Sequence, residues 1–564
     1  MYIQKVKMSN YRGLNIEIDD LKEYFLIFGK NDTGKTNFCT GIRKVLELNA
    51  RRKRFDEFDS TNCNKLPITI EIRFVVSDLT QQQKSNIGKF LDKEDGITYL
   101  DVLLKSTFNN DINLYEDELF FGNPKKDIFS QEPYRQNTLD RILDVIYIEP
   151  NYKIDDEKKQ YFKYHDIKKI EDETDFSATI KVKIDELEEE LEKDKIIKRM
   201  SKEINDFASE EADFFEGINF KFTPNITMSN LLKSLDIKPV SEKNELINNM
   251  GDGKTKILSM FLNDKAHDSE KIKIFIAEEP ENHLYPILQM GYIDLLKRVG
   301  SNQLIVTTHS PKIINLNKIE QLVKFYVKSG EISKETFAIN KGFFEEFGAL
   351  LNLEISEMLF YDKVLLVEGY SEKYFYDQLL LKDSNFRKKI INSKLGIFSI
   401  NGAAFGKTKL MLESLGIDVF IKTDNDITKV PKRDEKRYTG LLRCISLLTE
   451  TQKADLLDKT GLSSLGKEVF TFNSECDVNS EIEDKMSDIC DWFKMNHIYI
   501  SSHKTGFEGD LASYLGDQIE AKDIEFLKDK KLYNLHDLLL GENIDIKIND
   551  SNKDNILVRF AYEL

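Results

Sequence analysis

Short apolar runs that end at a glycine, a proline or an acidic residue recur along the chain and predict the strands of α/β units. Residues 24–28 are uniformly apolar, and residues 36–48 then have the apolar spacing of a helix. Residues 68–74 alternate apolar and polar side chains, as a half-exposed strand does. Residues 144–148 form another strand, which ends at Glu149 and Pro150. These patterns predict alternating strands and helices over residues 1–150.

The pattern changes between residues 151 and 240. The segment 185–192 is an acidic, helical stretch with sparse apolar positions. We interpret residues 151–240 as an inserted helical arm through which two copies of the chain dimerise, and an exposed helix without a partner is the alternative. The α/β pattern resumes over residues 241–345. A second α/β unit then occupies residues 346–564, and it becomes mostly helical toward its end.

A phosphate-binding loop follows the first apolar strand. Residues 29–36 match the motif G-x-x-x-x-G-K-[ST] in full, between a strand and a helix, which is the context that the motif requires. The backbone N–H groups of such a loop and the following helix N-terminus surround phosphates, and the loop lysine and hydroxyl reach the phosphates and Mg²⁺. The loop therefore predicts ATP binding. The residues expected to contact the nucleotide are Gly29, Asn31, Gly34, Lys35, Thr36 and Asn37.

Two later strands carry the groups that would act on the nucleotide. An apolar run ends in Glu278 and Glu279, of which the first is expected to hold Mg²⁺ and the second to polarise the attacking water. Residues 304–308 form a further strand that ends in His309, which we place near the γ-phosphate.

The interval between the phosphate loop and Glu278 is too long for a compact GTPase fold. ABC and SMC heads carry arms or helical subdomains between these two motifs. Heads of that kind need a loop that caps the nucleotide of a second head. The best candidate is the segment 249–254, in which Gly251 and Gly253 would present backbone donors to that nucleotide.

Three carboxylates in the second unit follow apolar strands. Glu368 ends one strand, and Asp424 and Asp426 end another. The carboxyl ends of strands are where α/β sheets place their ligands, and residues two apart in an extended segment share a face. Glu372 lies one helical turn after Glu368 and is expected to face the same site. Carboxylates are the ligands that Mg²⁺ or Mn²⁺ prefers, so we predict a metal site here.

A second metal ion would need further ligands, and Glu508 and Asp510 are the candidates. Lys531, or Lys530 beside it, would neutralise charge on the scissile phosphate. The predicted reaction is phosphodiester hydrolysis in which one metal activates water and the other stabilises the leaving oxygen.

Three successive strands end in Glu368-Gly369, in Asn401-Gly402 and in Asp424-Asn425-Asp426. This order resembles the Toprim fold. The whole chain resembles the OLD nuclease family and, within it, the nuclease subunits of bacterial Gabija anti-phage systems. The resemblance is carried by segments 28–38, 278–281, 308–311, 366–373 and 421–426.

This resemblance implies an α/β protein with an N-terminal ABC/SMC-like ATPase head, an inserted dimerisation arm and a C-terminal Toprim domain with helical additions. It also implies a homodimer or homotetramer that nicks or cuts double-stranded DNA with a divalent metal. Nucleotide would restrain cutting, and a UvrD-like helicase subunit would be the partner. The implied catalytic residues are Glu368, Asp424, Asp426, Asp510, Lys531 and His309.

Composition adds limits. The net charge of −17 argues against coating nucleic acid by bulk attraction but not against local binding. The five cysteines fit no zinc spacing and indicate a reducing cytoplasm. The N-terminal residues resemble a strand rather than a secretion signal, and no segment reaches the roughly 18 apolar residues of a membrane span.

Two other functions stay open. One is an ATP-binding DNA clamp of the RecF or SMC type without nuclease activity. The other is a primase or a topoisomerase, although the cysteines form no zinc module for the former and the 22 tyrosines single out no nucleophile for the latter.

Overall fold

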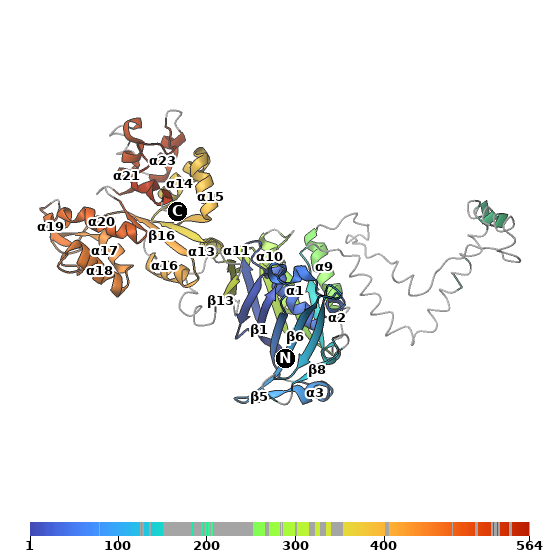
Figure 1. Cartoon of the computed structure of the whole chain (residues 1–564). Coiled ribbons are helices and arrows are strands. Elements are labelled where there is room, and N and C mark those ends of the chain that lie inside the picture. Colours follow the sequence, from blue (N-terminus) through green and yellow to red (C-terminus); the bar gives the residue numbers. More distant parts are fainter. Residues whose placement is uncertain are drawn as a thin grey trace. The chain divides into compact units, whose positions relative to one another are not determined.

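The structure of the chain is a computed structural model (Figure 1). The structure describes residues 1–150, 252–314, 322–339 and 353–562, with short gaps inside these ranges, and a few isolated positions between 182 and 206. The predicted arm therefore lies almost entirely outside the described residues. The described chain forms two compact units, Met1–Ala338 and Ile339–Leu564. None of the helices in the described part has the length and apolar content to cross a membrane.

A parallel sheet carries the phosphate loop in the first unit. Its strands, in spatial order, are β13 (Lys334–Ile339), β12 (Leu322–Val327), β3 (Tyr24–Gly29), β11 (Gln303–Thr308), β10 (Ile272–Glu278) and β9 (Leu143–Ile148). The pairs β12–β3, β3–β11, β11–β10 and β10–β9 are each parallel. Every residue of β3 and β11 is buried, and this burial explains the apolar runs at residues 24–28 and 304–306.

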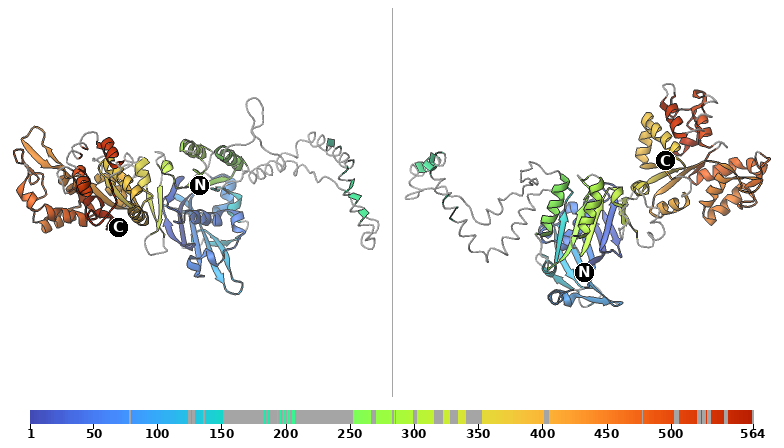
Figure 2. Two further views of the ribbon diagram at one scale, coloured as in Figure 1. Left: turned by 90° about the horizontal axis from the view of Figure 1, so that it is seen from above. Right: turned by 180° about the vertical axis from the view of Figure 1, so that it is seen from behind.

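Helices cover both faces of this sheet. Helix α1 (Lys35–Leu46) contacts β3 and β9 on one side and strands of a second sheet on the other. Helices α9 (Asp252–Lys265) and α10 (Pro286–Arg298) lie on the opposite face of the parallel sheet (Figure 2). The chain crosses the sheet in one direction from β3 to β9 and then returns through β10 to β11 in the other direction. Right-handed crossovers therefore place α1 on one face of the sheet and α9 and α10 on the opposite face. The remaining short helices are α2 (Leu48–Arg51), η1 (Glu57–Asp59), η2 (Thr61–Cys63), α3 (Gln81–Ile87), η3 (Gly88–Phe90), η4 (Thr138–Arg141) and α11 (Pro311–Ile314).

The second sheet of this unit is antiparallel. Its strands run in the order β2 (Leu14–Ile18), β1 (Tyr2–Tyr11), β4 (Ile68–Val75), β6 (Ile97–Asn109), β7 (Leu114–Phe121) and β8 (Ser130–Glu132), with β5 (Asp92–Glu94) paired to β6. The predicted alternation of strands and helices is therefore wrong for this part, because a short turn rather than a helix joins β6 to β7. Gln303 links the two sheets: its side chain accepts a bond from the Ile3 N–H (2.9 Å) and donates to the carbonyls of Ile3 (2.8 Å) and Lys22 (3.0 Å).

The second unit is built on a parallel sheet of strand order β15 (Leu395–Ser399), β14 (Lys363–Val367), β16 (Asp418–Thr423) and β20 (Ile498–Ile500). Helices α14 (Tyr370–Lys382) and α15 (Ser384–Ser393) lie on one face and α16 (Phe405–Ser414) on the other (Figure 1). A small antiparallel sheet of β17 (Ile427–Lys429), β18 (Glu435–Tyr438) and β19 (Thr471–Asn473) follows β16.

The other helices of this unit are α13 (Leu353–Met358), α17 (Thr439–Ser446), α18 (Glu450–Thr460), α19 (Ser480–Asp484), α20 (Met486–Met495), α21 (Phe507–Leu515), η6 (Gly516–Gln518), α23 (Lys531–Leu540), α24 (Ile556–Arg559) and η7 (Phe560–Tyr562).

Candidate functional site

The phosphate loop leaves the carboxyl end of β3 and enters α1, as its motif predicts. Gly34 caps α1 with a φ of 94°, a left-handed conformation that favours glycine. At Gly29 the constraint is space, because a Cβ there would lie 2.2 Å from the carbonyl oxygen of Phe325 on β12. The loop is therefore held against the neighbouring strand by a contact that no side chain could fit.

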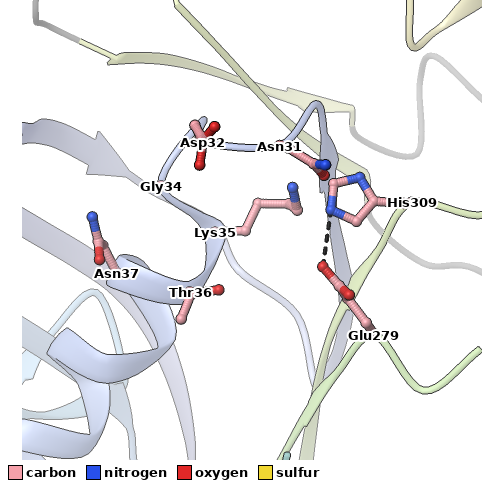
Figure 3. Close-up of a pocket in the computed structure, with 8 residues that line it drawn as sticks. All are labelled: Asn31, Asp32, Gly34, Lys35, Thr36, Asn37, Glu279 and His309. Carbon is pink, nitrogen blue, oxygen red and sulfur yellow. Dashed lines mark ion pairs between the residues drawn. The ribbon is translucent and has the colours of Figure 1, made fainter. Parts of the chain in front are cut away.

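A cavity of about 550 Å³ opens beside this loop (Figure 3). Lys35 Nζ donates to the carbonyls of Gly29 (3.0 Å) and Lys30 (2.7 Å). Burial lowers the pKa of Lys35 to about 8, although Glu279 and Glu281 oppose the shift. The lining residues are Asn31, Asp32, Gly34, Lys35, Thr36, Asn37, Glu279 and His309. Most of the predicted nucleotide contacts thus line one cavity.

His309 and Glu279 both line the cavity and face each other. Its Nε2 lies 2.9 Å from Glu279 Oε1, the pair marked in Figure 3. Burial and the nearby Lys35 lower the pKa of His309, which favours the neutral imidazole. Glu281 positions the histidine, because its Oε1 accepts bonds from the His309 N–H (2.7 Å) and from Thr308 Oγ1 (2.6 Å). Glu281 belongs to the segment 278–281 that carries the family resemblance, but that motif alone predicts no role for it.

Glu278 is placed differently from Glu279. It ends β10, is 2% exposed, and is not among the cavity-lining residues. Burial raises the pKa of Glu278, while the neighbouring Tyr147 and Cys39 lower it. Of the predicted capping loop, Gly251 lies outside the described residues and Gly253 lies in the first turn of α9.

The acidic residues of the second unit converge. Glu368 follows β14, and Asp424 and Asp426 follow the adjacent strand β16, with Val367 paired to Lys422 in register. One oxygen from each of the three carboxylates lies within 4.8 Å of the others. Asp424 Oδ1 is buried and receives no hydrogen bond, and Lys422 Nζ lies 3.8 Å from it. This all-oxygen donor set fits Mg²⁺ or Mn²⁺.

Arg443 on α17 is part of this cluster and was missed by sequence reasoning. Its Nη1 contacts Glu368 and donates to Thr423 Oγ1 (2.8 Å), and its Nη2 lies 3.9 Å from Asp426. The guanidinium therefore balances the negative charge of the group. No motif marks Arg443, because it comes from a helix that the sequence pattern did not link to the strands.

Two of the other predicted metal ligands, Glu372 and Asp510, lie around a lysine together with Asp424. Lys422 Nζ lies 2.9 Å from Asp510 Oδ2, 3.6 Å from Glu372 Oε1 and 3.8 Å from Asp424 Oδ1. The second oxygen of Glu372 accepts the N–H groups of Glu368 (2.7 Å) and Gly369 (3.0 Å) and so caps α14. Burial raises the pKa of Glu372 to about 7 and that of Asp424 to about 6. Burial opposes the charge of Lys422, but the three carboxylates raise its pKa.

The remaining predicted residues lie outside the three-carboxylate group. Glu508 is buried on α21. Lys531 begins α23, and Lys530 lies outside the described residues.

Comparison with known families identifies both units. A family model described as the AAA ATPase domain matches residues 1–314. A model described as the overcoming lysogenization defect protein-like TOPRIM domain matches residues 359–426, which include all three clustered carboxylates. The predicted order of an ATPase domain followed by a Toprim domain, and the predicted OLD resemblance, are confirmed.

Two curated proteins are similar over nearly their whole length. Endonuclease GajA of Bacillus cereus (strain VD045) is 25% identical over 571 residues, which cover 96% of this chain and 95% of the relative. Old nuclease of Escherichia phage P2 is 23% identical over 599 residues, which cover 97% of each chain. Among solved structures, an Smc head domain with an extended coiled coil from Pyrococcus furiosus is 14% identical, covers 62% of this chain and 98% of that one, and has a TM-score of 0.35.

Proposed function

We propose that this chain, which belongs to the AAA ATPase domain family and also carries an OLD-like TOPRIM domain, is a divalent-metal-dependent DNA endonuclease under nucleotide control. The observation that carries the proposal is the convergence of Glu368, Asp424 and Asp426 within 4.8 Å, inside the segment that matches the TOPRIM family. The two similar proteins named as nucleases support it.

The three carboxylates would hold the metal, and Arg443 would contact the substrate. A divalent ion bound there would polarise the scissile phosphate and make a bound water more acidic. Arg443 lies at the edge of the group, so its guanidinium is available to a phosphate oxygen once a metal neutralises Glu368. The neighbouring strand ends keep the carboxylates oriented without rearrangement, which is what catalysis by preorganised charge requires.

The nucleotide cavity of the first unit would act as the control element. Lys35 and Thr36 would bind the phosphates and Mg²⁺ of ATP, and Asn31, Gly34 and Asn37 would complete the contacts. The Glu279–His309 pair faces the same cavity and would sense the γ-phosphate. We infer that bound ATP holds a conformation in which DNA does not reach the carboxylates, so that loss of nucleotide releases cutting.

The similarity to Endonuclease GajA extends the proposal to the biological setting. The chain would act on double-stranded DNA in the bacterial cytoplasm, in defence against phage. It would assemble as a homodimer or homotetramer through the arm at residues 151–240, with the ATPase head divided into residues 1–150 and 241–345 and the nuclease domain at 346–564. A UvrD-like helicase subunit of the GajB kind would be its partner.

A plasmid nicking assay with Mg²⁺ or Mn²⁺ tests the activity. Wild-type protein should convert supercoiled plasmid to nicked and linear forms, and Glu368→Ala should abolish the conversion. Glu413→Ala is the matched control, because Glu413 is an exposed carboxylate that pairs with Lys409 on α16. Cutting by Glu368→Ala at the wild-type rate would refute the site. Wild-type protein that binds plasmid without cutting it would instead be an ATP-dependent DNA clamp.

A titration with ATP tests the control element. ATP should inhibit wild-type cutting, and Lys35→Ala should cut at the basal rate without inhibition, because Lys35 is the buried cation of the nucleotide cavity. A Lys35→Ala protein that is folded but cannot cut at all would show that the head drives cleavage rather than restrains it.

A further inference from the structure

Lys422 occupies an unusual place for a charged residue. It lies in β16, where its side chain is 1% exposed, between the buried residues Ile421 and Thr423. A buried ammonium is unfavourable unless carboxylates compensate it. Three do so here: Asp510 at 2.9 Å, Glu372 at 3.6 Å and Asp424 at 3.8 Å.

These carboxylates are the ones that a second metal ion would need. Asp510 and Glu372 are two of the three ligands predicted beyond the Glu368–Asp424–Asp426 group, with Glu508 the third, and both direct an oxygen at the Lys422 ammonium. Asp424 belongs to both sets, because it faces Lys422 and is also a member of the three-carboxylate group. In two-metal sites the ions lie about 4 Å apart, so a cation next to a shared carboxylate stands where the second ion would be.

The charge of Lys422 disfavours a second ion here, since the ammonium lies among the oxygens of Asp510, Glu372 and Asp424 that such an ion would use. The side chains of Asp510 and Glu372 are 0% and 3% exposed, so their charge is balanced by Lys422 rather than by water. The other oxygen of Glu372 is already bonded to the N–H groups of Glu368 and Gly369. A divalent ion among these oxygens would also meet the lysine charge at close range in a buried pocket, where like charges repel strongly.

We propose that the Lys422 ammonium replaces the second metal ion, so that the nuclease centre binds one divalent cation, at Glu368, Asp424 and Asp426. This inference rests on the proposed function only in assuming that the three-carboxylate group binds metal. Lys422 is then a positioning residue: its ammonium lies against Asp424, Asp510 and Glu372 and holds these three buried side chains in place.

Counting bound Mn²⁺ on the full-length, nucleotide-free protein tests the proposal without any cleavage assay. Isothermal titration and electron paramagnetic resonance should find one ion per wild-type chain, with the spectrum of an isolated ion. Glu368→Ala gives the background to subtract, since it removes a ligand of the proposed ion. Two ions per wild-type chain with a spin-coupled spectrum would overturn the proposal, and no ion at all would overturn the metal-dependent function itself.

Lys422→Gln tests the role of the ammonium directly. The variant keeps a polar chain of similar length but leaves the three carboxylates uncompensated, so the count should rise from one Mn²⁺ to two. Lys373→Gln is the matched control, because Lys373 is a partly exposed lysine on α14 that pairs with Asp377, and its count should stay at one. A folded Lys422→Gln protein that still binds one ion would overturn the assignment. If that variant does not fold, the wild-type count decides.

Discussion

Gly440 offers the sharpest test of how the fold positions the metal ligands. It lies in the first turn of α17 and packs directly on the loop that carries Asp424 and Asp426. A Cβ at Gly440 would lie 2.2 Å from the Asp424 carbonyl oxygen, 2.8 Å from Asn425 Cα and 3.0 Å from the Asp426 nitrogen. All three neighbours are backbone atoms, so Gly440→Ala cannot be accommodated by turning a side chain.

The size of the effect follows from these distances. Real Cβ atoms essentially never approach another heavy atom within 3.0 Å, so the helix and the loop must separate by nearly an ångström. Displacing a reacting group by about 1 Å lowers a rate by roughly 100-fold. Overpacking of this kind costs about 1–3 kcal/mol of stability, while replacing a helical glycine by alanine contributes about 0.5–1 kcal/mol. We therefore expect a modest loss of stability and a large loss of nicking activity.

Gly406→Ala is the matched control for this prediction. Gly406 also lies in a helix, α16, but a Cβ there would meet only Leu447 Cδ2 at 3.5 Å, an ordinary contact. That variant should nick plasmid at the wild-type rate and melt at the same or a slightly higher temperature. The reasoning fails if Gly440→Ala nicks as fast as Gly406→Ala while both proteins are folded by circular dichroism.

Three further predictions concern the two sites. Arg443→Ala should lower plasmid nicking roughly 100-fold, since a phosphate contact is lost. The same variant should bind Mn²⁺ more tightly, because a cation that competes for Glu368 is gone. Unchanged Mn²⁺ affinity would contradict this expectation. Chelation by EDTA should stop cleavage and added Mg²⁺ or Mn²⁺ should restore it, and cleavage that continues in EDTA would exclude the metal mechanism. In the empty cavity Lys35 has a pKa of about 8, so it loses its proton as the pH rises through that value, and with it the charge that attracts phosphate. ATP binding, followed with a fluorescent analogue, should weaken roughly 10-fold between about pH 7 and pH 9, whereas Lys35→Arg should show a flat profile; equal slopes would refute the role of Lys35.

The strand ends were predictable because short-range pattern determines them. The strand predicted to end at Glu368 is β14, and the run at 24–28 is contained in β3. Neighbouring parallel strands bring their carboxyl ends to one edge, so Glu368 had to approach Asp424 once β14 and β16 were adjacent.

What could not be predicted depends on contacts between distant segments. Spacing placed Glu372 on the correct side of α14, but a carboxylate at that position either binds a metal or caps the helix, and only the bonds to Glu368 and Gly369 distinguish the two. Arg443 carries no motif. Lys422 did leave a signal, because a lysine that directly follows the apolar residues 419–421 of a buried strand needs a compensating partner. The sequence does not say which partner that is.

The position of β3 between β11 and β12 has a consequence for synthesis. All the strands that pair with β3 come from residues beyond 300, so the phosphate-loop strand leaves the ribosome long before either neighbour exists. At translation rates of about 5–20 residues per second, its apolar edges stay unpaired for at least tens of seconds. Exposed edges of this kind favour aggregation. A nascent chain that stalls before β11 would therefore be a natural client for chaperones.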